Sequence, residues 1–143
     1  LQDQFGRASA EEVMSGRGIL NIYRALARHN GVTITLDEPS QVTEKALDGS
    51  CGICESTLTQ FCRIMGSFAG NLALNMATTG GVFIGGGIAN RFTQFLQGSD
   101  FRARFEAKGQ MKHYVKDIPT YLIAEPDHGL LGASAYLKQH TAS

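Results

Sequence analysis

The most informative stretch of the sequence is Thr79-Gly80-Gly81-Val82-Phe83-Ile84-Gly85-Gly86-Gly87-Ile88-Ala89-Asn90-Arg91-Phe92. Its β-branched and aromatic run, Val82 to Ile84, predicts a short strand, and a helical pattern follows the three glycines at once. Glycine has no Cβ, so it turns at positive φ and lets another molecule lie against the backbone. A helix that begins after such a turn directs unpaired N–H groups and a positive dipole end toward the same place. The stretch therefore predicts a backbone turn shaped to hold a nucleotide.

Two better-known glycine-rich motifs do not fit this turn. The dinucleotide-binding signature needs a third glycine where Asn90 stands, and an acidic residue about 20 residues later in a βαβ unit. A P-loop needs a lysine after the glycines, and none follows here. A tight turn without any ligand stays open as an alternative, although three consecutive glycines are costly unless their backbone shape is needed.

The composition is that of one ordinary soluble globular domain. The 143 residues are 43% hydrophobic and 18% charged, and 13 Lys plus Arg balance 13 Asp plus Glu. With this balance we expect no attraction to nucleic acid or to a membrane surface. The sequence shows no signal peptide and no long apolar run, so we expect a cytoplasmic protein with reduced cysteines. Because the chain begins with Leu1 rather than methionine, we expect a truncated or processed product.

The spacing of apolar residues predicts a mostly helical chain with two strands. The strands are expected at 81–84 and 119–124, each followed by a helix, which favours a small parallel α/β sheet covered by helices. Ser9 and Glu12 have the capping-box spacing that opens a helix. Helices are expected at 9–15, 19–29, 41–47, 51–77, 88–97 and 130–140, with one or two more between 101 and 114 and with loops at 32–39 and 125–129.

The longest expected helix, Cys51 to Ala77, carries apolar residues three or four apart almost throughout. Such a wide apolar face indicates a helix that is buried on much of its circumference. Gly66 and Gly70 make one flank thin, so the backbone of a neighbouring element could approach closely.

The other reactive residues do not form a catalytic set. Cys51 and Cys54 have zinc-knuckle spacing, but no second Cys or His pair completes four ligands, so we expect them to pack and cap a helix N-terminus. A redox motif would need a thioredoxin context, which is lacking, although a lowered thiol pKa stays open. Glu11 and Glu12 open a helix, where the dipole favours carboxylates, and capping is their default role. No Ser-His-Asp set, Cys-His set or suitable carboxylate pair can be assembled.

At this point several segments resemble bacterial-type glucokinases. Residues 12–25 resemble the family stretch E-x-V-L-S-G-x-G-L-x-N-L-Y-R-A, and residues 71–75 and 80–88 are similar to its GNLALN…GGVFIAGGI. The match continues in the same order through Arg91-Phe92, Phe101-Arg102-Ala103, Asp117-Ile118-Pro119 and Gly129-Leu130-Leu131-Gly132. It covers the chain from about Ser9 to the end, and several motifs in register make it far more specific than the glycines alone.

This resemblance implies the actin/hexokinase-like (ribonuclease H-like) α/β fold, with residues 1–143 as its larger, helix-rich C-terminal domain. Enzymes of this family phosphorylate the 6-hydroxyl of glucose with MgATP in the cytoplasm, usually as homodimers. We therefore expect glucose and ATP as partners, and neither nucleic acid nor a membrane.

The resemblance also assigns site residues. Gly85, Gly86 and Gly87 match the adenosine motif of the superfamily, so they are the expected nucleotide contacts. Glu11 matches a glutamate that binds a glucose hydroxyl, which leaves capping to Glu12. The pair Ser15 and Gly16 is expected to border the nucleotide cleft.

Important parts of the family site have no counterpart in this sequence. The phosphate loop, the Asn-Asp pair with the catalytic base and the Glu-x-x-His sugar clamp lie upstream in the family, so we expect no catalytic residue and no metal ligand here. Arg17 and Gly85 replace a proline and an alanine common in the family. Because phosphoryl transfer needs positioned phosphates, Mg²⁺ and a base, we expect this chain alone to be inactive. The alternatives are a non-catalytic sugar-responsive regulator and a dimerisation module built on the helix at 51–77.

Overall fold

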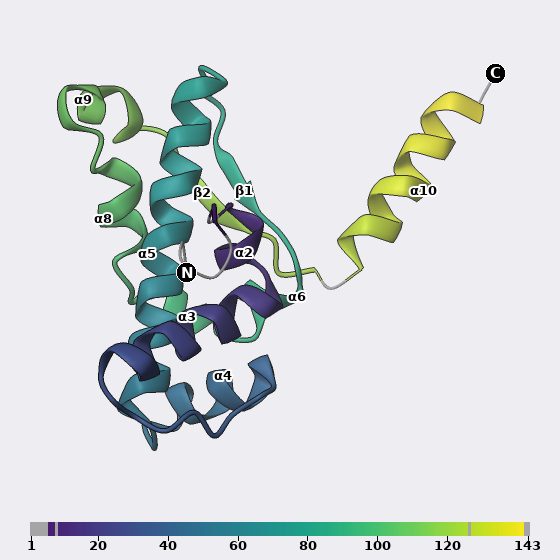
Figure 1. The fold of residues 1–143 in the computed structure, drawn as a ribbon. Coiled ribbons are helices and arrows are strands. Elements are labelled where there is room, and N and C mark those ends of the chain that lie inside the picture. Colours follow the sequence, from purple (N-terminus) through teal and green to yellow (C-terminus); the bar gives the residue numbers. More distant parts are fainter. Residues whose placement is uncertain (1–5, 8, 126, 142–143) are drawn as a thin grey trace.

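The long helix α5 (Gly52–Asn75) runs through the middle of the body, with the other helices around it (Figure 1). The computed structural model describes residues 6–7, 9–125 and 127–141. The remaining described elements are α2 (Glu11–Met14), α3 (Gly16–His29), α4 (Pro39–Leu47), β1 (Val82–Ile84), α6 (Gly87–Asn90), α7 (Thr93–Gln97), α8 (Phe101–Glu106), η1 (Gly109–Met111), α9 (Lys112–Val115), β2 (Thr120–Leu122) and α10 (His128–Thr141).

Burial of α5 confirms the prediction of a helix enclosed on much of its circumference. Helices α3, α4 and α8 all pack against it. The side chains of Leu58, Phe61 and Cys62 are fully or almost fully buried in the core that these helices share. The neighbouring helices cover part of this wide apolar face, and Phe68 and Leu72 stay exposed on the rest of it.

Helix α8 approaches α5 at two glycines. A Cβ atom at Gly66 would overlap the carbonyl group of Phe101, and one at Gly70 would overlap that of Phe105. The two phenylalanine rings are buried and lie 6.4 Å apart between centroids. The close backbone approach expected at Gly66 and Gly70 is therefore confirmed, and its partner is α8.

The two strands form the expected parallel sheet. Strand β1 pairs with β2 in the register Val82↔Thr120, Phe83↔Tyr121 and Ile84↔Leu122. Phe83 and Tyr121 are exposed and their rings stack, with centroids 5.0 Å apart. Val82, Ile84 and Leu122 are half-buried and pack against the helical core, which fixes where β1 ends.

Two local predictions are wrong. The helix expected at 88–97 is divided into α6 and α7, because Phe92 leaves the helical conformation (φ −134°, ψ 40°) and buries its ring edge-on against Phe61, with centroids 5.9 Å apart. The capping box of Ser9 and Glu12 does not form: Ala10 is the N-cap of α2, and it has no side-chain cap.

The last helix, α10, lies apart from the body (Figure 1). It begins two residues earlier than expected, and Pro126 of the expected loop lies outside the described residues. All described residues of α10 after His128 are exposed, and four of them are large and apolar: Leu130, Leu131, Tyr136 and Leu137.

Within the described part of the chain, no helix has both the length and the apolar character needed to cross a bilayer.

The contact between α5 and α8 gives a stability prediction. We expect Gly66→Ala to lower the free energy of unfolding by about 1–3 kcal/mol, because the new methyl group must displace the Phe101 carbonyl. The matched control is Gly132→Ala in α10, where the Cβ would meet nothing within 4 Å. This control is expected to raise stability by about 0.4–1 kcal/mol. Thermal unfolding followed by circular dichroism compares the two, and equal melting temperatures would contradict the close approach.

Candidate nucleotide site

The glycine turn has the backbone conformation that its sequence predicts. Strand β1 ends at Ile84, and α6 begins at Gly87, with Gly86 as its N-cap at φ 118° and ψ 151°. This positive φ strains any residue with a Cβ, so Gly86 is required by backbone shape. At Gly86 and Gly87 a Cβ atom would meet nothing within 4 Å, whereas at Gly85 it would lie 3.3 Å from the Cδ1 atom of Ile123. The space beside Gly86 and Gly87 is therefore open.

A cavity of about 540 Å³ lies beside this turn. It brings together the first helical residues of three helices: Gly16 of α3, Pro39 of α4 and Gly87 of α6. The other residues that line it are Ile19, Glu38, Ser40, Thr43, Ile88 and Arg91. Helix N-termini carry unpaired N–H groups and a partial positive charge, and Arg91 adds a full one, so the cavity offers an environment for phosphate groups.

Ser15 determines how α3 begins at this cavity. Its Oγ accepts a hydrogen bond from the backbone N–H of Gly18 at 3.1 Å and donates one to the Glu11 carbonyl at 2.9 Å. Gly18 lies so close to the backbone of Val13 that a Cβ there would overlap it. Ser15 is the N-cap of α3 and is not among the residues that line the cavity, whereas its neighbour Gly16 is.

A smaller cavity of about 130 Å³ lies at the same turn. Gly85, Gly86 and Gly87 line it, together with Met14, Phe61, Met65, Ile84, Ile88 and Ala89. Its lining is almost entirely apolar. Gly87 and Ile88 are common to both cavities, so Gly16, Gly85, Gly86 and Gly87 line two adjoining cavities, whereas Ser15 lines neither.

The model of the glucokinase family matches residues 1–140. The chain belongs to the glucokinase family. It is 50% identical over 139 residues to glucokinases of Escherichia coli O1:K1 and Shigella boydii serotype 18, which covers 97% of this chain and 43% of each relative. A crystal structure of a glucokinase from an Antarctic psychrotroph superposes with a TM-score of 0.89 at 40% identity, over 96% of this chain and 43% of that one. The expected actin/hexokinase-like fold is confirmed, and the chain spans less than half the length of these relatives.

The two glutamates of this glucokinase-family chain occupy different environments. Glu11 is exposed at the start of α2 and lines neither cavity at the glycine turn. Glu12 does not cap α2 as expected. Its carboxylate accepts a hydrogen bond at 3.3 Å from the Nδ2 of the buried Asn21, which also donates to the Glu12 carbonyl at 2.9 Å. Glu12 therefore ties α2 to α3.

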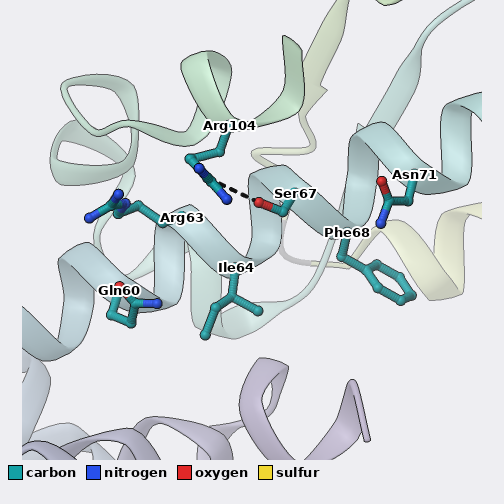
Figure 2. Close-up of a pocket in the computed structure, with 7 residues that line it drawn as sticks. All are labelled: Gln60, Arg63, Ile64, Ser67, Phe68, Asn71 and Arg104. Carbon is teal, nitrogen blue, oxygen red and sulfur yellow. Dashed lines mark hydrogen bonds between the residues drawn. The ribbon is translucent and has the colours of Figure 1, made fainter. Parts of the chain in front are cut away.

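A second groove, of about 330 Å³, lies along α5 and α8, and none of the expected site residues lines it. Figure 2 shows Arg104 reaching from α8 to Ser67 of α5, where its Nε donates to the Ser67 Oγ at 3.2 Å. Arg63 lies beside it and is paired with Asp100 at 3.7 Å. The exposed Phe68 points away from Arg104 (Figure 2). This groove is separate from the glycine turn.

Sequence reasoning did not identify Glu38, Ser40 and Thr43 as cavity residues. They lie on α4 and at its start, about 45 residues before the glycine turn, and only the packing of α4 against α3 and α5 brings them there. Nothing in their spacing indicates this. Among the described residues, no group of three or more His, Cys, Asp or Glu side chains could hold a metal ion.

Proposed function

We propose that the polypeptide to which this chain belongs transfers a phosphoryl group from ATP to the 6-hydroxyl of glucose in the cytoplasm. In this proposal the chain is the C-terminal domain and supplies the adenosine site and one sugar-binding glutamate. The observation that carries it is the cavity beside the glycine turn, where Gly16 and Gly87 meet at the ends of α3, α4 and α6. Family membership and this cavity support the same activity independently.

The lining of the larger cavity suits both parts of a nucleotide. Ile19, Pro39 and Ile88 offer apolar surface for a purine ring, while Arg91 and the N-termini of α3 and α4 favour the phosphates. Bare backbone at Gly87 lets the ligand approach α6 closely. In this arrangement Gly85 and Gly86 shape the turn beneath the ligand.

The nucleotide proposal is tested at Gly87. A Cβ at this position meets no other atom within 4 Å, and its φ is not positive, so Gly87→Val places a side chain in the cavity without straining the backbone. We expect the dissociation constant for ADP, measured by isothermal titration calorimetry on the intact polypeptide, to rise at least about tenfold. Gly52→Val, also at the first residue of a helix with open space around it, is the matched control and is expected to leave binding unchanged. Equal ADP affinities for the two variants would refute the site.

The proposal divides the rest of the reaction between Glu11 of this chain and residues outside it. We propose that Glu11 binds a hydroxyl group of glucose, since its carboxylate is exposed and accepts no hydrogen bond from the residues that the structure describes. Mg²⁺ and the base that takes the hydroxyl proton would be held by other parts of the intact polypeptide. Helix α10 agrees with such a larger structure, because an isolated exposed helix of this length is only marginally stable in water.

A coupled assay of glucose 6-phosphate formation tests this division of the reaction between the chain and the rest of the intact polypeptide. We expect the 143-residue chain alone to give no turnover, and the intact polypeptide to be active. In the intact polypeptide, Glu11→Gln is expected to raise KM for glucose about tenfold, a loss of ~1.4 kcal/mol. Glu55→Gln in the first turn of α5 is the control, with KM unchanged. Turnover by the chain alone would contradict the division. Sugar binding without turnover by the intact polypeptide would favour a sugar-responsive regulator instead.

We also propose that α5 forms the seam of a homodimer. Ile64, Phe68, Leu72 and Met76 follow one another at four-residue spacing along α5 and its C-cap, and Phe68, Leu72 and Met76 are 43%, 45% and 70% exposed. Side chains four apart lie on one face of a helix, so the stripe is continuous. A two-fold axis would place this stripe against its own copy, as isologous interfaces require.

Light scattering tests the dimer. We expect the intact polypeptide to have twice the mass of one chain, and Leu72→Asp to weaken the dimer at least tenfold, about 1.4 kcal/mol, because a carboxylate would be buried without a partner. Met111→Asp is the control, since Met111 is 44% exposed on η1, away from the stripe. A monomer at high concentration, or equal weakening by both variants, would contradict this seam.

A further inference from the structure

The N-terminus of α5 carries two thiols that the proposed kinase function does not use. Cys51 is the N-cap of α5, as expected from the sequence, and its Sγ accepts a hydrogen bond from the backbone N–H of Cys54 at 3.3 Å. Each of the two thiols also shifts the pKa of the other, which indicates that the two side chains lie near each other. The two cysteines therefore lie at the N-cap and in the first turn of one helix, and a hydrogen bond joins the Cys51 sulfur to the Cys54 backbone.

The two thiols differ in access. Cys54 is 0% exposed and belongs to the hydrophobic core, whereas Cys51 is half-buried and can be reached from solvent. A small reagent can therefore react with Cys51 first, while Cys54 is shielded from solvent in the core. When an accessible cysteine forms a mixed disulfide, a second cysteine nearby can attack that bond and release the small thiol. Cys51 and Cys54 have this combination of an accessible and a buried cysteine.

Burial, hydrogen bonds and nearby charges also give the two thiols different pKa values. Burial raises the pKa of the Cys51 thiol, but hydrogen bonds from the Cys54 thiol and from the backbone at Cys54 and Ile53, with the nearby Lys45, bring that pKa below its ordinary value. The pKa of Cys54 is raised to about 12, first by burial and then by its hydrogen bond to Cys51, with Asp48 also contributing. The reactive thiolate is therefore concentrated on the accessible sulfur.

We propose that Cys51 and Cys54 form a thiol–disulfide exchange pair that reacts with low-molecular-weight disulfides, with Cys51 as the attacking sulfur and Cys54 as the resolving one. This assignment does not depend on the kinase activity. It uses the one cysteine motif of the sequence that neither a metal site nor the nucleotide site accounts for.

The exchange proceeds in two balanced steps. The Cys51 thiolate attacks one sulfur of the small disulfide, the S–S bond of that disulfide breaks, and the first small thiolate leaves and takes up a proton. Cys54 then loses its proton and attacks the Cys51 sulfur of the mixed disulfide, which forms the Cys51–Cys54 bond and releases the second small thiolate. The protein loses two electrons and two protons, and the small disulfide is reduced to two thiols.

Cys62 is a control within the same helix. It is also 0% exposed, and burial raises its pKa to about 11, but it lies two turns further along α5 than Cys54. Any general reactivity of cysteines in this chain would appear at Cys62 as well. The proposal requires that it does not.

The experiment uses the 143-residue protein and oxidised glutathione as the probe. The protein is incubated at graded ratios of reduced to oxidised glutathione, remaining thiols are trapped with iodoacetamide, and intact mass and peptide mapping identify the products. We expect two of the three cysteines to become resistant to alkylation together, through a Cys51–Cys54 disulfide, while Cys62 stays alkylatable after unfolding. At short times, iodoacetamide should modify Cys51 at least about tenfold faster than Cys62 in the native protein.

Three variants separate the roles of the sulfurs. Cys51→Ser keeps an N-cap acceptor, so it is expected to fold and to lose all reaction with oxidised glutathione. Cys54→Ser should stop at a mixed disulfide of glutathione with Cys51, and Cys62→Ser should react like the unaltered protein. Circular dichroism verifies that each variant is folded. Absence of the 51–54 disulfide at every ratio, a disulfide that includes Cys62, or undiminished reaction in Cys51→Ser would each overturn the proposal.

Discussion

The body of this chain depends on one long helix, α5, which α8 can approach closely because Gly66 and Gly70 have no side chain. At Gly66 and Gly70 the carbonyl groups of α8 occupy the space that Cβ atoms would fill. The same helix presents Phe61 to Phe92 on another side, and this contact fixes the end of α6. The position of the glycine turn relative to α3 and α4 therefore follows from how α5 is packed, rather than from the sheet, which has only two strands of three residues.

Features set by local sequence could be predicted. The apolar spacing from Cys51 onward indicated α5 within a few residues of its ends, and Gly66 and Gly70 indicated the close neighbour. The run Val82 to Ile84 and the glycines after it indicated the strand and the turn, because β-branched residues favour strands and Gly86 must adopt a positive φ. Each of these signals depends on the residue itself or on its near neighbours in the chain.

Features set by contacts between distant segments of the chain could not be predicted from the sequence. The divided helix at Arg91 and Phe92 follows from burial of a ring against Phe61, which no local pattern encodes. Glu12 has the spacing of a capping box with Ser9, yet it pairs with Asn21 instead, since the buried amide of Asn21 needs an acceptor. Likewise, the site residues on α4 reach the cavity only through helix packing. For the candidate site, the sequence indicated the turn and Gly16, whereas Glu38, Ser40 and Thr43 on the opposite side of the cavity are brought there by helix packing.

Helix α4 is the element that the nucleotide cavity and the thiol pair have in common. Its first residue, Pro39, lines the cavity, and Lys45 near its end lies close enough to Cys51 to influence the thiol. A modification changes the affinity of a distant site only if it favours one of two arrangements that bind the ligand differently. A disulfide between Cys51 and Cys54 joins two residues in the same turn of α5 and adds no link to α4. The buried side chains of Val42 and Ala46 hold α4 in the core. Helix α4 therefore supports both the candidate nucleotide cavity and the surroundings of the two thiols.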